Sequence, residues 1–393
     1  MVKAFKFARL PEIVFRNGSI AGLPDLIKKY GGSVLLVTGK SSFITSEKGK
    51  DLLRAMEGLK IPFNLVHITT EPAPAMIDDA VDTFRGMDPS LVVGIGGGSV
   101  LDAAKAISAM MTVEGPVKEY LEGVGTREHP GTKLPFIAIP TTSGTGSEAT
   151  KNAVISEVGP EGFKKSLRHD HFVPDIALLD PELTLDCPRD ITAASGMDCF
   201  TQLTEAFLSE KASAYTDAFA REGLRAIKSS LVRVCKDGSD LEARTGMSFA
   251  ALNSGICLAN AGLGTVHGFA SSVGGRLEIP HGLVCGTLMA VINRINVREL
   301  GKENRDSRAL RKYAELGRLF LDVENKSDNF YIDGFIDYLY SLNSELGIPG
   351  LGSYGLEEKH ITDIIAATDN KNNPIKLGPE EMEEAIRERM GNQ

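Results

Sequence analysis

The segment SLVVGIGGGSVLDAAKA, residues 90–106, joins a short apolar run to three consecutive glycines and the start of a helical pattern. A continuous apolar run that ends in glycine is typical of a strand buried on both faces of a parallel sheet. Helical stretches such as 79–87 and 100–111 alternate with such runs. The other runs lie at 33–40, 63–69, 134–142 and 175–180. The first half of the chain is therefore predicted to be an α/β domain with a parallel sheet covered by helices on both faces.

The pattern changes in the second half. From about Ile191 onward the strand signal fades, and apolar residues recur at helical spacing, as in 216–234 and 309–323. A chain of 393 residues also exceeds what one hydrophobic core usually serves. We therefore predict two domains, an α/β domain over 1–186 and an all-helical domain over 187–393, joined by a short packed connection near 183–190.

Composition excludes several classes of partner. The chain has 43 basic and 52 acidic residues and a net charge of -9, without a basic run, which argues against nucleic acid. No window approaches the roughly 20 apolar residues of a membrane span, and the N-terminus lacks a signal-peptide pattern. We expect a cytoplasmic protein. Five widely spaced cysteines without a C-x-x-C pair predict reduced, mostly buried thiols: Cys187, Cys199, Cys235, Cys257 and Cys285.

The three glycines at 96–98 follow a buried strand and open a helix. Backbone N–H groups can approach an anion closely there, at the positive end of the helix dipole. A tight strand-to-helix turn also favours glycine, so this loop alone supports both interpretations. Ser99, Asp102 and Lys105 form one face of the helix, and we expect them to point back to the loop, which favours phosphate binding.

A second polar loop, PTTSGTGSEAT at 140–150, follows another buried strand and offers several small hydroxyl side chains. Taken singly, an ordinary turn rich in serine and threonine is the simpler interpretation. Two such loops at the carboxyl ends of strands mark the crevice where open α/β sheets bind ligands. Together the loops favour a dinucleotide.

The histidines suggest a metal site. The chain has only seven, yet His267 and His281 lie fourteen residues apart around a Gly-Gly turn, in what we expect to be a hairpin-like loop. Asp198 and Gln202 are four residues apart on a predicted helix, so they point the same way. A carboxylate and two imidazoles suit divalent zinc or iron with an open position for substrate. Single histidines are more often structural, and the glycines that flank both of them favour the metal site.

Several long motifs then resemble the iron-containing (group III) alcohol dehydrogenase family, a relative of glycerol dehydrogenase and dehydroquinate synthase. They include GGGSVLDAAKA, PTTSGTGSEAT, PDIALLDPELT, TAASGMDCFTQLTEAFLS, NAGLGTVHGFA and IPHG, in that order over nearly the full length. The resemblance implies a Rossmann-like NAD(P)-binding domain, an all-α domain of the dehydroquinate synthase type that binds metal and substrate, and catalysis between them. We expect the protein to form a homo-oligomer, namely a dimer.

The resemblance also implies the site residues. Gln202 stands where the family normally has a histidine ligand, and Ser271 stands where many members have a second histidine near the nicotinamide. The implied metal ligands are Asp198, Gln202, His267 and His281. The implied catalytic residues are Asp102, Asp198, His267 and His281. The cofactor-binding residues expected are Gly39, Lys40, Ser41, Ser42, Gly96, Gly97, Gly98, Ser99, Asp102, Thr141, Thr142, Thr145, Ser147, Lys164 (or its neighbour Lys165) and Leu183.

The implied reaction is metal-assisted hydride transfer between an alcohol and NAD(P), with zinc slightly favoured over iron. An aspartate at the Gly39 position is associated with NAD in the family. Its absence, with Lys40 next to it, favours NADP, although the same residues also suit a plain surface turn. Two other functions stay open: reduction of an anionic carbonyl, as in maleylacetate reductase, and cofactor binding by a protein whose metal site has decayed.

Overall fold

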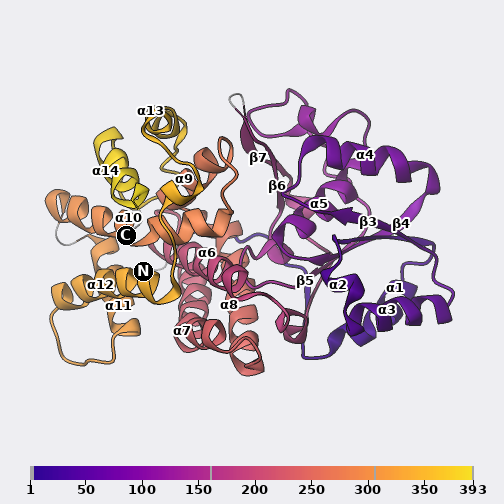
Figure 1. Ribbon diagram of the computed structural model, residues 1–393, viewed down its shortest axis with the longest axis horizontal. Coiled ribbons are helices and arrows are strands. Elements are labelled where there is room, and N and C mark those ends of the chain that lie inside the picture. Colours follow the sequence, from indigo (N-terminus) through magenta and orange to yellow (C-terminus); the bar gives the residue numbers. More distant parts are fainter. Residues whose placement is uncertain (1–3, 160–161, 305–306, 392–393) are drawn as a thin grey trace.

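A computed structural model describes residues 4–159, 162–304 and 307–391, and it shows an α/β part beside a helical part (Figure 1). Six strands form one sheet in the order β1-β8-β5-β4-β2-β3, and every neighbouring pair is parallel. The strands are β1 (Glu12–Phe15), β2 (Ser33–Gly39), β3 (Phe63–Ile68), β4 (Pro89–Gly96), β5 (Phe136–Pro140) and β8 (Ile176–Leu179). This arrangement confirms the predicted fold class.

Helices cover both faces of the sheet because successive strand residues point to opposite sides. In β2, Leu35 and Val37 join the core beneath α4 and α5, whereas Val34 and Leu36 join the core beneath α1 and α3. Figure 1 shows these two pairs of helices on opposite faces. The helices of this part are α1 (Leu23–Lys28), α2 (Ser42–Thr45), α3 (Glu47–Gly58), α4 (Pro74–Phe84) and α5 (Gly98–Met110).

Three strands were not predicted. β1 is only four residues long and lies at the sheet edge, where it is partly exposed. β6 (Asn152–Glu157) and β7 (Phe163–Arg168) form a separate antiparallel pair, and their polar residues interrupt any continuous apolar run. Short 3-10 helices fill other connections: η1 (Ser19–Gly22), η2 (Arg85–Met87), η3 (Val117–Tyr120), η4 (Ser147–Ala149), η5 (Asp170–Phe172), η6 (Pro181–Thr184) and η7 (Leu351–Tyr354).

The second part is helical from Arg189 onward, as predicted. Its central helix α6 is buried along most of its length and packs against α7, α8 and α10 (Figure 1). The last strand of the sheet ends at Leu179, and the boundary after residue 186 stays a prediction. The helices are α6 (Arg189–Leu208), α7 (Ala214–Lys236), α8 (Leu241–Ala261), α9 (Thr265–Gly274), α10 (His281–Glu303), α11 (Arg308–Phe320), α12 (Asp328–Leu346), α13 (Glu358–Ala367) and α14 (Pro379–Met390).

In the described ranges, no single helix combines the length and the apolar composition needed to cross a membrane. The pair α8 and α9 meets both criteria only when the two are joined, and they meet at an angle of 97°.

The two polar loops lie together at the carboxyl edge of the sheet. Gly96 and Pro140 are paired at the ends of neighbouring strands β4 and β5, and the Thr141 N–H donates to the Gly96 carbonyl at 2.9 Å. A Cβ on Gly98 would lie 2.5 Å from Cγ2 of Thr145, which real structures do not tolerate. Glycine at 98 therefore lets the second loop pack directly against the first.

Candidate active site and metal centre

Four side chains from three helices converge in the helical part: Asp198 on α6, His267 on α9, and His281 and Cys285 on α10. One donor atom from each lies within 4.8 Å of all the others. Nε2 of His267 is 3.1 Å from Oδ1 of Asp198, and Nε2 of His281 is 3.8 Å from the same oxygen. The His281 side chain is 26% exposed, against 2% for Asp198, so the site opens on the side of His281.

Helix packing, and not a hairpin, brings the two histidines together. His267 lies in the first turn of α9 and His281 is the first residue of α10, so our expectation of a hairpin-like loop was wrong. A Cβ on Gly282 would lie 2.4 Å from the Ala194 carbonyl oxygen and 3.3 Å from Cβ of Asp198. The missing side chain at 282 lets α10 approach α6, which places His281 beside Asp198.

A carboxylate outside the predicted set orients His267. Nδ1–H of His267 donates to Oε2 of Glu205 at 2.6 Å, and the Val266 N–H donates to Oε1 of the same residue at 2.7 Å. The bond at Nδ1 fixes the ring and points Nε2 at Asp198. Glu205 follows Asp198 by seven residues, a spacing that shares one helix face, so the sequence held a signal for it.

The charges of the site fit a cation. Burial alone would raise the pKa of Asp198, but the hydrogen bond from His267 and the charge of that imidazole hold it below its usual value. Burial opposes protonation of His267, yet the fields of Cys285 and Glu205 and the bond to Asp198 raise its pKa well above its usual value. The Nε2 proton of His267 thus lies between imidazole and carboxylate, where a divalent cation would replace it.

His281 completes the fit. Burial, with the positive charges of Lys164 and His267, lowers the pKa of His281 to about 3, so the ring is neutral, as a metal ligand must be. Its Nδ1 is buried and has no hydrogen-bond partner among the residues that the structure describes. A carboxylate oxygen and two imidazoles are suitable donors for zinc or iron.

Gln202 lies beside Asp198, as its spacing predicts. Its Nε2 donates to Oδ2 of Asp198 at 3.3 Å. Because an ionised carboxylate can only accept, the amide NH₂ has to face it. Oε1 of Gln202 is buried without a partner in the described part of the chain. Gln202 therefore holds one oxygen of Asp198, which leaves the other facing the histidines; whether it also binds a metal stays a prediction.

Asp102 and Lys105 organise the second polar loop. Asp102 accepts hydrogen bonds from the Ser147 hydroxyl and the Val154 N–H. The buried ammonium of Lys105 donates to the Ser147 carbonyl at 2.9 Å and to the Thr150 hydroxyl at 3.0 Å. We expected this helix face to point at the glycine loop. It faces the second loop instead, because a buried ammonium needs acceptors and the loop carbonyls and hydroxyls supply them.

The other predicted cofactor residues surround these loops. Gly39 ends β2, next to β4, and a Cβ on it would meet only the Ser42 hydroxyl, at 3.9 Å. Lys40, Ser41, Ser42 and Lys165 are exposed. Thr142 lies against Gly97, Ser99 is in the first turn of α5, and Leu183 packs on the sheet core from η6.

Lys164 lies on β7, which packs against α9. Its ammonium bonds both carboxylate oxygens of Glu71, at 2.7 and 2.6 Å. Its charge acts on the pKa of both Asp102 and His281. It therefore lies between the cofactor loops and the metal cluster.

Ser271 and Lys371 lie beside His267. The Ser271 hydroxyl donates to the His267 carbonyl at 2.9 Å, and the Lys371 ammonium donates to the same carbonyl at 2.9 Å. Lys371 has a φ of 51°, an unusual backbone conformation for lysine. Sequence reasoning missed this lysine because nothing in its spacing connects residue 371 with residue 267.

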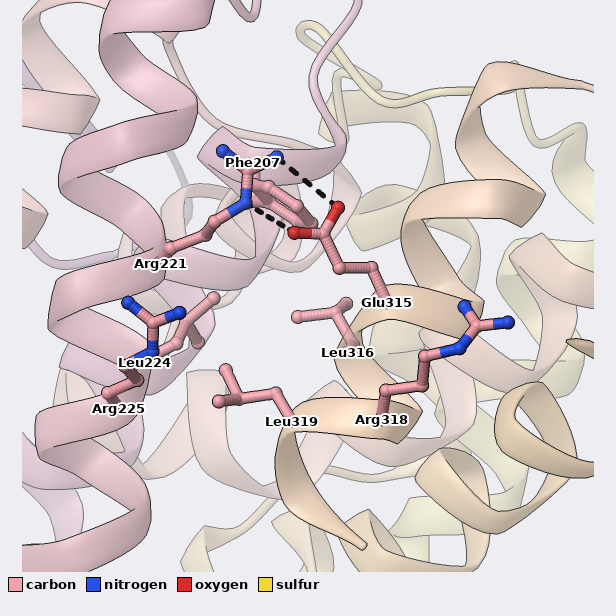
Figure 2. A pocket seen from close by; sticks show the side chains of 8 residues that line it. All are labelled: Phe207, Arg221, Leu224, Arg225, Glu315, Leu316, Arg318 and Leu319. Carbon is pink, nitrogen blue, oxygen red and sulfur yellow. Dashed lines mark hydrogen bonds and ion pairs between the residues drawn. The ribbon is translucent and has the colours of Figure 1, made fainter. Parts of the chain in front are cut away.

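A hollow of about 250 Å³ between α7 and α11 has no part in this cluster (Figure 2). Each of its arginines is paired with a carboxylate: Arg221 with Glu315, Arg225 with Glu222 and Arg318 with Asp328. Figure 2 shows the first of these pairs above Leu316. Since these charges are already compensated, we assign the hollow no ligand.

Comparisons with known proteins agree with this architecture. Residues 11–181 match the family "Iron-containing alcohol dehydrogenase", and residues 192–390 match "Fe-containing alcohol dehydrogenase family, C-terminal". The NAD-dependent methanol dehydrogenase of Bacillus methanolicus is 31% identical over 89% of this chain and 90% of its own length. A 1-propanol dehydrogenase of Citrobacter freundii is 33% identical over 77% of this chain and 75% of its own length.

A solved alcohol dehydrogenase of Oenococcus oeni shares the fold. Its TM-score is 0.87 at 27% identity, and the match covers 98% of this chain and 100% of that one. The parallel sheet, the helical domain and the cluster of Asp198, His267 and His281 are thus found in a chain that matches both family regions in order. The protein belongs to the iron-containing alcohol dehydrogenase family and is an oxidoreductase.

Proposed function

We propose that the protein interconverts a small alcohol and its aldehyde or ketone, with one divalent cation held by Asp198, His267 and His281 and with NADP(H) as the preferred cofactor. The convergence of these three donors, with Glu205 behind His267, is the observation that carries the proposal. A homodimer and a cytoplasmic location remain predictions.

When bound, the cation would act as a Lewis acid that polarises an alcohol or carbonyl oxygen and lowers the pKa of a hydroxyl. Side chains of the protein position and balance the charge of the cation. Asp198 supplies a negative charge, and Glu205 holds the ring of His267 in place. Because Asp198 and His267 are buried while His281 is partly exposed, the substrate oxygen would enter on the His281 side.

The cofactor would lie along the two polar loops. NAD(P) supplies the hydride carrier. The glycines at 96–98 precede the 13-residue helix α5, whose first N–H groups and positive dipole end suit a pyrophosphate. Thr142, Thr145 and Ser147 line the facing loop. Asp102 and Lys164 would then flank the ribose nearest the metal, because the charge of Lys164 acts on both Asp102 and His281.

NADP(H) preference rests on Gly39 and Lys40. No carboxylate ends β2 to bond a ribose 2′-hydroxyl or repel a 2′-phosphate. Lys40 is exposed, and no ion pair of the described residues includes it. The methanol dehydrogenase that this chain resembles is named as NAD-dependent, so that relative does not support a preference for NADP. Kinetics with both cofactors will decide between them.

Metal analysis tests the central proposal. The purified protein should retain about one divalent cation per chain, and Asp198→Ala, His267→Ala and His281→Ala should each lose both metal retention and alcohol oxidation. His171→Ala, at an exposed histidine of η5, is the matched control. Full metal occupancy in His281→Ala would remove His281 from the site. A metal-free protein that still binds cofactor would favour the decayed-site alternative.

Lys371 favours one second candidate, an alcohol or carbonyl substrate that carries a negative charge. Its ammonium is held beside His267, where it could pair with a substrate anion. In Lys371→Met, the KM for a hydroxy acid should rise at least tenfold more than the KM for a neutral alcohol of the same length. Equal changes for the two substrates would leave the neutral-alcohol assignment in place.

A further inference from the structure

Cys285 contributes a donor atom that the sequence had not placed in the site. It follows His281 by four residues on α10, so both side chains lie on the same helix face. The thiol is fully buried, and its Sγ is 3.6 Å from Nε2 of His267. Its sulfur also lies within 4.8 Å of the donor atoms of Asp198 and His281. The sulfur therefore contacts His267 and belongs to the same cluster of donor atoms as the three proposed ligands.

The separations match a tetrahedral centre. Two nitrogen or oxygen ligands about 2.1 Å from a tetrahedral ion lie roughly 3.4 Å apart, and a nitrogen and a thiolate sulfur lie roughly 3.6 Å apart. The structure has 3.1 Å between His267 and Asp198 and 3.8 Å between His281 and Asp198. It has 3.6 Å between His267 and the sulfur of Cys285. Three of the six donor separations are thus close to coordination geometry before any ion is added, and all six lie within 4.8 Å.

Gln202 is the alternative candidate for the fourth metal ligand. Its amide nitrogen is committed to Oδ2 of Asp198, and only the neutral Oε1 remains to bind an ion. A thiolate is the stronger donor for zinc, and its charge, with that of Asp198, balances a divalent cation. Two pairs of residues four apart could supply two ligands each: Asp198 and Gln202 on α6, and His281 and Cys285 on α10. The stronger donor favours the pair on α10.

We propose that Cys285 is the fourth protein ligand of the metal centre, as a thiolate, that the substrate oxygen enters as a fifth ligand, and that this centre selects zinc over iron. The inference rests on the proposed function, because it requires the metal site. On binding, the thiol proton passes to solvent and the sulfur lone pair forms the metal bond. Gln202 stays an outer partner that positions Asp198.

Cobalt(II) substitution tests the ligand directly, without any activity measurement. A cobalt–thiolate bond gives a near-ultraviolet charge-transfer band that nitrogen and oxygen ligands do not give. Wild type, Gln202→Ala and the buried-cysteine control Cys257→Ser should all show the band. Cys285→Ser should lack it and bind cobalt at least about tenfold more weakly, since the loss of an outer-shell partner alone costs 10–100-fold.

The outcomes separate this inference from the proposed function. Wild type that binds one cobalt ion without the band, or a Cys285→Ser variant that keeps the band, overturns thiolate ligation and leaves the metal-dependent oxidoreductase intact. Wild type that binds no cobalt overturns both. If Cys285→Ser does not fold, the spectrum of wild type and that of Cys285→Ala, which buries no hydroxyl, still decide the question. Iron in preference to zinc, in a competition between equal amounts, contradicts the metal selection.

Discussion

Glu205 Oε2 accepts a hydrogen bond from Nδ1 of His267 at 2.6 Å, and both groups are buried. Glu205 also accepts the Val266 N–H, so neither of its oxygens is free to move. A carboxylate held in this way fixes the imidazole tautomer, so the other ring nitrogen faces Asp198.

Glu205→Gln should therefore weaken metal binding by about 10–100-fold, because the amide holds the imidazole less firmly while it keeps the shape of the side chain. Isothermal titration with zinc measures the change. Glu210→Gln, at an exposed position just after α6, should leave the affinity unchanged. An unchanged affinity in Glu205→Gln would mean that packing alone orients His267.

Gln202→Ala should lower metal affinity by less than Glu205→Gln does, because only one oxygen of Asp198 loses a partner. Gln202→His should tighten binding, since imidazole is a better donor than an amide for these ions. Dissociation constants that do not change in either variant would show that the side chain at 202 has no influence on the centre.

Gly39→Asp should lose most of the NADP(H) activity and keep the NAD(H) activity. The new carboxylate has room, since a Cβ at 39 meets only the Ser42 hydroxyl, and it would repel a 2′-phosphate. Steady-state kcat/KM with each cofactor measures the change, and Gly58→Asp at the open end of α3 controls for added charge. A higher kcat/KM with NAD(H) in wild type, unaffected by Gly39→Asp, would contradict the NADP preference.

Glu148 predicts a dependence of stability on pH. Burial, and the nearby charge of Asp102, raise its pKa from 4.5 to about 7 despite Lys105. The folded state therefore binds more protons than the unfolded state between these values, so stability falls as pH rises through this window, by up to about 3 kcal/mol from this group. Urea denaturation at both ends of the window should show a smaller fall in Glu148→Gln.

The matched control for this comparison is Glu57→Gln, at an exposed position on α3. It should keep the wild-type slope. A Glu148→Gln variant that also keeps the wild-type slope would assign the pH dependence to other groups.

Gly282→Ala should destabilise the protein by about 1–3 kcal/mol and weaken metal binding, because its Cβ would press α10 away from α6. Gly301→Ala is a control on the same helix: a Cβ there meets nothing within 4 Å, so it should be neutral or stabilise by up to about 1 kcal/mol. Thermal unfolding and zinc titration measure both effects. Equal behaviour of the two variants would show that α10 can shift without cost.

The sequence predicted what depends on local pattern. Strands such as β2 and β4 are buried on both faces and so appear as continuous apolar runs. The pair β6 and β7 was missed because lysines such as Lys164 interrupt the apolar pattern.

The metal cluster could not come from spacing, because Asp198 and His267 are 69 residues apart and only the packing of α9 and α10 on α6 joins them. The residue types and the glycines beside the two histidines suggested a metal site, and the family resemblance then implied the ligand set. It did not supply Cys285, whose place four residues after His281 was visible in the sequence.

All the donor side chains of the centre belong to α6, α9 and α10, whereas the glycine loops that suit the dinucleotide belong to the sheet domain. The metal site and the proposed cofactor site thus belong to different domains. Release of the cofactor from the sheet domain would therefore leave the metal ligands in place, so that one metal ion could serve many turnovers. Metal supply would then limit the enzyme once, at assembly, and not in each cycle.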